Sequence, residues 1–139
     1  MHPMRPLSLL KAALAALTIM LFSACSPANP SLQVSLDEGR ALLESGGAVL
    51  VDIREPSEHA HGVAPGMVLL PMSQLPARLN ELPRDPAKPL LLICNTQNRS
   101  ARVAEQLHAA GLTHVRFVDG GMSGWARRGW PMVRPGSGG

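Results

Sequence analysis

Short continuous runs of hydrophobic residues alternate along the chain with segments in which apolar residues recur at helical spacing. A short apolar run bounded by turn-forming residues is typical of a strand buried on both faces. Such runs predict strands at 48–53, 67–70, 90–94 and 114–118. The segments between them predict helices that begin near Ser35, Ser73, Ser100 and Gly121.

Two of these helices carry clear boundary signals. Ser35 followed by Glu38 forms a capping box, and Gly46-Gly47 ends the same segment. The helix that begins at Ser100 is expected to stop at Gly111.

Strands that alternate with helices indicate an α/β fold with a central, mostly parallel sheet, helices on both faces and right-handed crossovers. The carboxyl ends of parallel strands meet at one edge, where ligands bind. Asp52, Cys94 and Asp119 lie at predicted strand ends, so we expect them at that edge. The two aspartates can instead serve as strand-end caps or turn formers.

Residues 1–24 have the pattern of a targeting segment. Arg5 and Lys11 accompany an uncharged apolar stretch, 12–22, which has about half of the roughly 20 residues needed to span a bilayer. The stretch leads into Ser23-Ala24-Cys25, which resembles a bacterial lipobox. This resemblance implies a signal peptide at 1–24 and lipidation of Cys25. Ordinary secretion and an uncleaved anchor are the alternatives.

The same resemblance sets the expected organisation of the chain. We expect a lipidated N-terminus and flexible tether at 25–33, one domain at 34–134 and a flexible tail at 135–139. Ser26 stands where an aspartate would be the signal for inner-membrane retention. The resemblance therefore implies an exported, membrane-anchored lipoprotein that faces the periplasm, on the outer membrane if the host is Gram-negative.

The charge balance gives no support to nucleic-acid binding. The chain has 13 basic and 10 acidic residues, a net charge of +3. Without Arg5 and Lys11 the 13 basic residues become 11, and the net charge falls to +1. The basic pI therefore comes largely from the targeting segment and indicates neither a nucleic-acid nor an anionic-lipid partner.

Cys94 is the candidate nucleophile. If Cys25 carries lipid, Cys94 is the only thiol of the mature chain, and an unpaired cysteine in an exported protein suggests a reactive thiol. It lies on a strand-to-helix turn, where free backbone N–H groups and the helix dipole favour an anion. The loop that follows offers no apolar side chain to cover the sulfur. The alternative is a small buried hydrophobe that ends a strand.

A metal site is not expected. Zinc binding would need a second cysteine or a histidine pair at ligand spacing. His59 and His61 flank one residue in a polar segment and are expected to be surface residues.

Three blocks of the chain resemble the signatures of single-domain rhodaneses. The first comprises 51–62 with Pro65-Gly66, and the last comprises 120–125 with Gly129-Trp130-Pro131. Between them lies a segment similar to the active-site loop of that family, Cys94-Asn95-Thr96-Gln97-Asn98-Arg99, followed by Ser100. The resemblance covers Val34 to Val133.

The resemblance implies a sulfurtransferase. Cys94 would take a sulfane sulfur from a small-molecule donor such as thiosulfate as a persulfide, and pass it to a thiol or cyanide acceptor. The implied substrate-binding residues are Asn95, Thr96, Gln97, Asn98 and Arg99, with Asp52, Arg54 and Ser100 in support. No cofactor is implied, and the protein partner is unknown. The alternative is a rhodanese-like module at the cell envelope that binds sulfur or docks a partner without turnover.

The loop length and two departures refine this resemblance. Cys94 to Arg99 spans six residues, as in rhodaneses, whereas related cysteine phosphatases have one more. Sulfur transfer is therefore favoured over phosphate or arsenate chemistry. Val63-Ala64 replaces a common histidine, and Gln97 replaces a common glycine, which would permit positive φ and leave room for the acceptor. Gln97 therefore bears on substrate preference and turnover.

Several charged and aromatic side chains have two possible roles. Arg99 either faces the anionic end of the donor or ties the loop to Asp52 or another carboxylate. Arg54 is expected to be structural, with Glu58 as its partner. Trp125 and Trp130 are expected to pack in the core and at its edge.

Mass spectrometry of the mature N-terminus tests the lipidation of Cys25. We expect a chain that begins at Cys25 and carries several acyl chains, because a single chain anchors a protein only marginally. An unmodified first residue other than Cys25, or an intact Met1, would contradict both the lipid anchor and the single-thiol argument.

Overall fold

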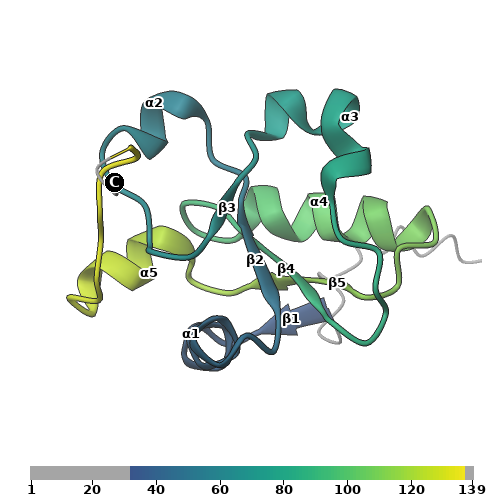
Figure 1. Ribbon diagram of the computed structural model, residues 1–139, viewed down its shortest axis with the longest axis horizontal. Helices are drawn as coiled ribbons and strands as arrows, with labels where there is room; N and C mark the ends of the chain where they lie inside the picture. Colours follow the sequence, from purple (N-terminus) through teal and green to yellow (C-terminus); the bar gives the residue numbers. More distant parts are fainter. Residues whose placement is uncertain (1–31, 137–139) are drawn as a thin grey trace, which may run out of the picture.

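The computed structural model describes residues 32–136, which form a parallel sheet between two layers of helices (Figure 1). The strand order is β1-β5-β4-β2-β3, and every pair is parallel. The strands are β1 (Gln33–Val34), β2 (Val49–Asp52), β3 (Val68–Leu69), β4 (Leu90–Ile93) and β5 (Val115–Val118). The predicted α/β class is therefore confirmed.

The helices divide between the two faces of the sheet. One apolar cluster joins the sheet to α3 and α4, and the other joins it to α1 and α5. The helices are α1 (Leu36–Ser45), α2 (Pro56–His59), α3 (Leu75–Arg78), α4 (Asn98–Ala109) and α5 (Gly121–Arg127), with 3-10 turns η2 (Met72–Gln74) and η3 (Leu79–Glu81). Figure 1 shows α3 and α4 on one side of the strands and α1 on the other.

The central strand β4 explains why the apolar runs are continuous. Leu90 and Leu92 point into the cluster under α4, and Leu91 and Ile93 point into the cluster under α1 and α5. All four are completely buried. A strand covered on both faces has no solvent side, so alternation of polar and apolar residues is absent.

The parallel register brings the ends of the strands to one edge, as expected. Asp52 pairs with Ile93, so Cys94 follows directly beside the end of β2. Asp119 directly follows β5, and its Oδ1 accepts a hydrogen bond from the Gly120 amide at 3.0 Å. Asp119 therefore serves the turn, which is the structural alternative given above.

The helix signals were partly correct. Ser35 caps α1, since its Oγ accepts from the Glu38 amide at 3.2 Å, and Gly46 ends the helix with φ +72°. Helix α4 begins at Asn98, two residues before the expected Ser100. The expectation that Ser73 caps a helix is wrong, because its amide and hydroxyl both donate to the Glu55 carboxylate, at 3.0 and 2.7 Å.

Two elements were not predicted. Helix α2 has only four residues, but a capping box of Glu55 and Glu58 and a proline at its first position stabilise it. Strand β1 begins at Gln33, and the preceding Leu32 is buried in the core. The ordered domain thus includes two residues that the sequence placed in the tether. The signal segment and Cys25 lie outside the described residues. Within residues 32–136 no helix is long and apolar enough to cross a bilayer.

The N-terminus of α5 packs directly against the loop after β4. The Met122 amide donates to the Cys94 carbonyl at 2.8 Å, and the Ser123 amide donates to the Asn95 carbonyl at 2.9 Å. Gly121 lies so close that a Cβ atom there would come within 2.3 Å of the Thr96 carbonyl oxygen. This contact requires glycine, because the obstructing atoms belong to the backbone.

Substituting Gly121 tests how far the fold depends on this contact. Gly121 and Gly120 both have positive φ, +57° and +75°, but a Cβ at Gly120 meets nothing within 4 Å. Gly120→Ala should therefore lower the free energy of unfolding by about 1 kcal/mol, for the left-handed backbone alone. Gly121→Ala should lower it by about 3 kcal/mol or more, because the loop must also move. Urea unfolding measures both, and equal losses would show that the approach of α5 is not tight.

Candidate active site

Cys94 lies between β4 and α4 at the carboxyl edge of the sheet. Its Sγ lies 3.5 Å from the Ser100 amide and 3.4 Å from Ser100 Oγ. The Ser100 hydroxyl donates to the Gln97 carbonyl at 3.1 Å, so Oγ accepts from the thiol. The loop thus folds back on itself, and the first turn of α4 faces the sulfur.

The Cys94 residue is buried, with only 1% of its surface exposed. It belongs to the apolar cluster that contains Leu90 and Leu92 of β4 and the buried apolar side chains of α4. The loop offers no apolar side chain to cover the sulfur, as expected, but the residue is nevertheless buried among core side chains, as in the alternative given for Cys94.

The loop after Cys94 places its polar side chains outward. Asn95, Thr96 and Asn98 are exposed, and Gln97 and Arg99 are half-buried. Within the described part of the chain, no group accepts a hydrogen bond from the amides of residues 95–97. These amides and the start of α4 remain available to an anion.

The backbone of Gln97 lies outside the left-handed region that favours glycine. Its φ is −161°, which any residue adopts, and among residues 32–136 only glycines have positive φ. Its carbonyl also accepts from the Ala101 amide at 2.8 Å. The loop therefore closes without the conformational freedom of glycine, and any effect of Gln97 comes from the bulk of its side chain.

A residue that sequence reasoning missed supports the loop from α5. Ser123 Oγ donates to the Asn95 side-chain oxygen at 2.9 Å, in addition to the backbone bond between the same two residues. The signal was present, because Ser123 lies in the block 120–125 quoted above. Its role could not be read from the block alone.

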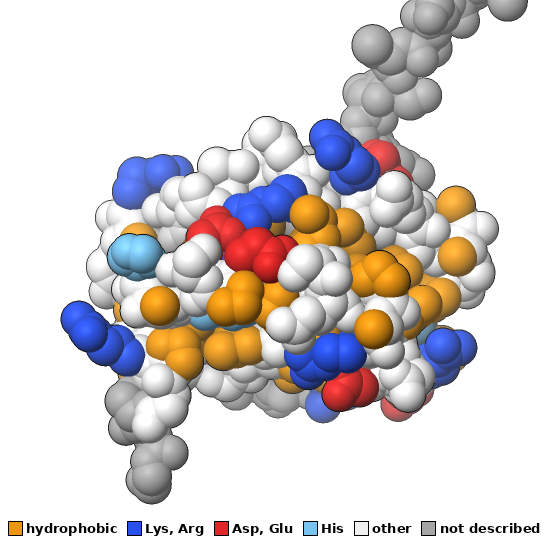
Figure 2. Space-filling model, turned by 90° about the horizontal axis from the view of Figure 1, so that it is seen from above, with side chains coloured by type: hydrophobic (Ala, Val, Ile, Leu, Met, Phe, Trp, Pro, Cys, Tyr) orange, Lys and Arg blue, Asp and Glu red, His pale blue; other side chains and the backbone are white. Residues whose placement is uncertain are grey.

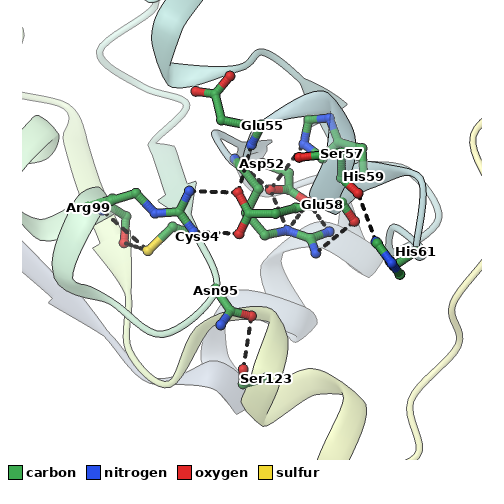
Figure 3. A network of polar contacts seen from close by, with 12 residues as sticks. Asp52, Glu55, Ser57, Glu58, His59, His61, Cys94, Asn95, Arg99 and Ser123 are labelled. Atoms are coloured by element: carbon green, nitrogen blue, oxygen red, sulfur yellow. Dashed lines mark hydrogen bonds and ion pairs between the residues drawn. The ribbon is translucent and has the colours of Figure 1, made fainter.

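Arg99 is bound to Glu58 by two hydrogen bonds, of 2.7 and 2.6 Å (Figure 3). Glu58 also accepts from the Glu55 amide at 2.9 Å, which fixes the carboxylate on α2. The bonds from Arg99 lower the pKa of Glu58 to about 2, although burial acts in the opposite direction. Arg99 therefore ties the loop to a carboxylate, the second of the two roles considered, and the carboxylate is Glu58.

Asp52 and Arg54 form a buried pair behind this contact. Arg54 donates to Asp52 from its amide, Nε and Nη2, with distances of 2.7–3.1 Å, and to the Gly62 carbonyl at 2.8 Å. The expected pairing of Arg54 with Glu58 is wrong, since only the Glu58 backbone carbonyl is near, at 3.4 Å. The Asp52–Arg54 pair holds the segment from β2 to Gly62 in place.

The two histidines differ in environment. His61 is exposed as expected, but His59 is buried, with 5% exposed, because the turn of α2 directs it toward Asp52. Its Nε2 lies 3.3 Å from Asp52 Oδ1. The described residues contain no group of three or more side chains arranged to hold a metal ion.

The aromatic side chains pack as expected. Trp125 is 3% exposed and donates from Nε1 to the Pro131 carbonyl at 2.9 Å. Trp130 is half-buried and meets Trp125 edge to face. Figure 2 shows that acidic, basic and hydrophobic side chains intermingle on the face seen there, so this face presents no continuous field of one sign.

Comparison with known proteins places this geometry in a family. The profile of the rhodanese-like domain matches residues 35–128. A sulfurtransferase of Allochromatium vinosum is 36% identical over 94 residues, which cover 68% of this chain and 86% of that protein.

Solved structures agree. A rhodanese-related protein of Thermoplasma volcanium has a TM-score of 0.64 and 30% identity, and covers 73% of this chain and 96% of its own. A human single-domain sulfurtransferase has a TM-score of 0.59 and 29% identity, with 70% and 96% covered. These likenesses support a function of the sulfurtransferase type. The match over residues 35–128 shows that the chain belongs to the rhodanese family.

Proposed function

We propose that the protein transfers a sulfane sulfur through a persulfide on Cys94, with a donor such as thiosulfate and a thiol or cyanide as acceptor. One observation carries the proposal. Cys94 Sγ lies 3.5 Å from the Ser100 amide, inside a loop whose remaining amides face no protein acceptor among residues 32–136. Such a loop is built to stabilise negative charge on sulfur.

The first step forms the persulfide. The Cys94 thiolate attacks the outer sulfur of thiosulfate, and a new S–S bond forms. The S–S bond of the donor breaks, and sulfite leaves with the electron pair. Net charge is conserved, and no oxidant, metal or cofactor takes part.

The second step removes the sulfur. An acceptor thiolate attacks the outer sulfur of the Cys94 persulfide and leaves as a new persulfide, while the electron pair returns to Cys94. With cyanide, the product is thiocyanate. The loop amides stabilise the anion at each stage, because both the thiolate and the persulfide carry their charge within the loop.

Ser100 supports the change of charge on Cys94. While Cys94 is a thiol, the hydroxyl of Ser100 donates to the Gln97 carbonyl and its oxygen accepts from the sulfur. Once the thiol loses its proton, rotation of the hydroxyl turns it into a donor to the thiolate. Ser100 thereby serves both protonation states from one position.

The cell envelope is the proposed location, from the lipobox resemblance at Cys25. That part of the proposal depends on residues outside those described here. A module that holds sulfur on Cys94 without turnover remains the second candidate, and the half-buried glutamine at 97, where the family commonly has glycine, favours it.

Cys94→Ser tests the nucleophile. Incubation of the wild-type protein with thiosulfate should add one sulfur atom to Cys94, and cyanide should remove it. The serine variant should lose all loading, at least about a thousandfold in rate, because an alcohol is not a thiolate at neutral pH. Intact-protein mass spectrometry measures loading, and thermal unfolding confirms that the fold is retained. Retained sulfurtransferase activity in a folded variant would refute the assignment.

Gln97→Gly tests whether the loop mouth limits turnover. Removal of the side chain should raise kcat/KM with thiosulfate, by up to about tenfold, if the half-buried glutamine narrows the approach to the loop. Gln97→Ala is the matched control, and since Gln97 needs no special backbone conformation, it should give a similar gain. Steady-state kinetics with cyanide measures both. Unchanged or lower values would mean that glutamine does not hinder the acceptor.

A further inference from the structure

Glu58 neutralises the positive charge that the loop would otherwise present to an anionic donor. Between Cys94 and Arg99 the four residues are uncharged, so Arg99 is the only cation of the loop itself. Both of its terminal nitrogens donate to the Glu58 carboxylate, at 2.7 and 2.6 Å. The two side chains form one neutral unit at the mouth of the site (Figure 3).

Glu58 is firmly held and cannot easily leave Arg99. It is the last member of the capping box of α2 and accepts from the Glu55 amide, while its own carbonyl accepts from the buried Arg54. The Glu58 and Arg99 side chains are 32% and 30% exposed, so solvent only partly screens the pair. An incoming anion would have to displace the Glu58 carboxylate from Arg99. Glu58 belongs to the same chain and is already in place, so its contact with Arg99 costs no translational freedom, whereas binding of a free anion does.

We propose that Glu58, because it neutralises Arg99, determines which donor charge the site accepts. The site then selects singly charged sulfane-sulfur donors, namely thiosulfonates and organic persulfides, over the thiosulfate dianion. The inference rests on the proposed transfer through Cys94. Loop amides can stabilise one negative charge on the reacting sulfur pair. The second charge of thiosulfate would meet a guanidinium that is already neutralised. Arg99 keeps other N–H groups that can donate a hydrogen bond, but it contributes no net positive charge.

Methanethiosulfonate isolates this effect, because it replaces one anionic oxygen of thiosulfate by a methyl group. The Cys94 thiolate attacks its outer sulfur, the Cys94–sulfur bond forms, and the S–S bond of the donor breaks. Methanesulfinate leaves with the electron pair, so two negative charges stand on each side of the reaction. The two donors thus undergo the same bond changes and differ by one charge.

Glu58→Gln is the matching change in the protein. Glutamine keeps the shape of the side chain and one oxygen that can accept from Arg99, but it frees the positive charge. Glu55→Gln is the control, since it removes the same charge nearby, while the Glu55 carboxylate accepts hydrogen bonds from Ser73 and acts on Arg99 only through a weak coulombic interaction. Both variants are compared with the wild type.

The measurement is the second-order rate constant for sulfur loading of Cys94 by each donor, followed by mass spectrometry. In Glu58→Gln the ratio of thiosulfate to methanethiosulfonate loading should rise by about tenfold or more, the effect of one charge-assisted contact. Intrinsic donor reactivity cancels, because each ratio is compared with that of the wild type. Loading by thiosulfate in this variant should also fall more steeply with salt. Glu55→Gln should change the ratio far less, because the Glu55 charge acts on Arg99 only weakly and without a hydrogen bond.

Two results would overturn the inference alone. One is an unchanged donor ratio in Glu58→Gln, and the other is an equal loss of loading with both donors, which would make Glu58 a purely structural support. Failure of the wild type to load sulfur from either donor would instead overturn the proposed function itself, and this inference with it.

Discussion

The position of Cys94, the proposed nucleophile, depends on the pairing of β4 between β2 and β5. This strand is buried on both faces and hydrogen-bonded on both edges, so its end has a single possible place. Cys94 is the first residue after it. Because the register aligns Ile93 with Asp52, the sulfur site and the buried Asp52–Arg54 pair share one edge of the sheet. Everything that contacts the sulfur is arranged around this fixed point.

Two short helices complete the site from outside the unit formed by β4, the loop after it and α4. Helix α2 supplies Glu58, which anchors the end of the loop through Arg99, and α5 supplies the amides that anchor its start. Neither element has more than seven residues, and such short helices are marginal alone. Their stability comes from what they contact, so the loop and its two supports are mutually dependent.

The sequence predicted four of the five strands, β2 to β5, because each of these lies in a largely apolar run. Strand β1, of two residues with an exposed Gln33, carries no such pattern and was not predicted. The sequence also predicted the place of Cys94 at a strand-to-helix turn, because an apolar run ends there and a helical pattern follows. It did not predict the Arg99–Glu58 pair, since the residues lie 41 positions apart and several carboxylates were available. The burial of Cys94 was kept only as an alternative for a related reason, because its covering atoms come from other elements. Ser73 shows a different failure: a serine before a helix fits a cap, yet its hydroxyl serves Glu55.

The contact between α5 and the loop also fixes the direction of two peptide planes. The carbonyls of Cys94 and Asn95 point toward the amides of Met122 and Ser123. In a trans peptide the N–H of the next residue points the opposite way, and no cis bond occurs in the described residues. The amides of Asn95 and Thr96 are therefore directed away from α5 before any donor arrives. These two amide dipoles need not reorient when negative charge develops on the sulfur. The free energy needed to orient them is spent when the chain folds and not during the reaction.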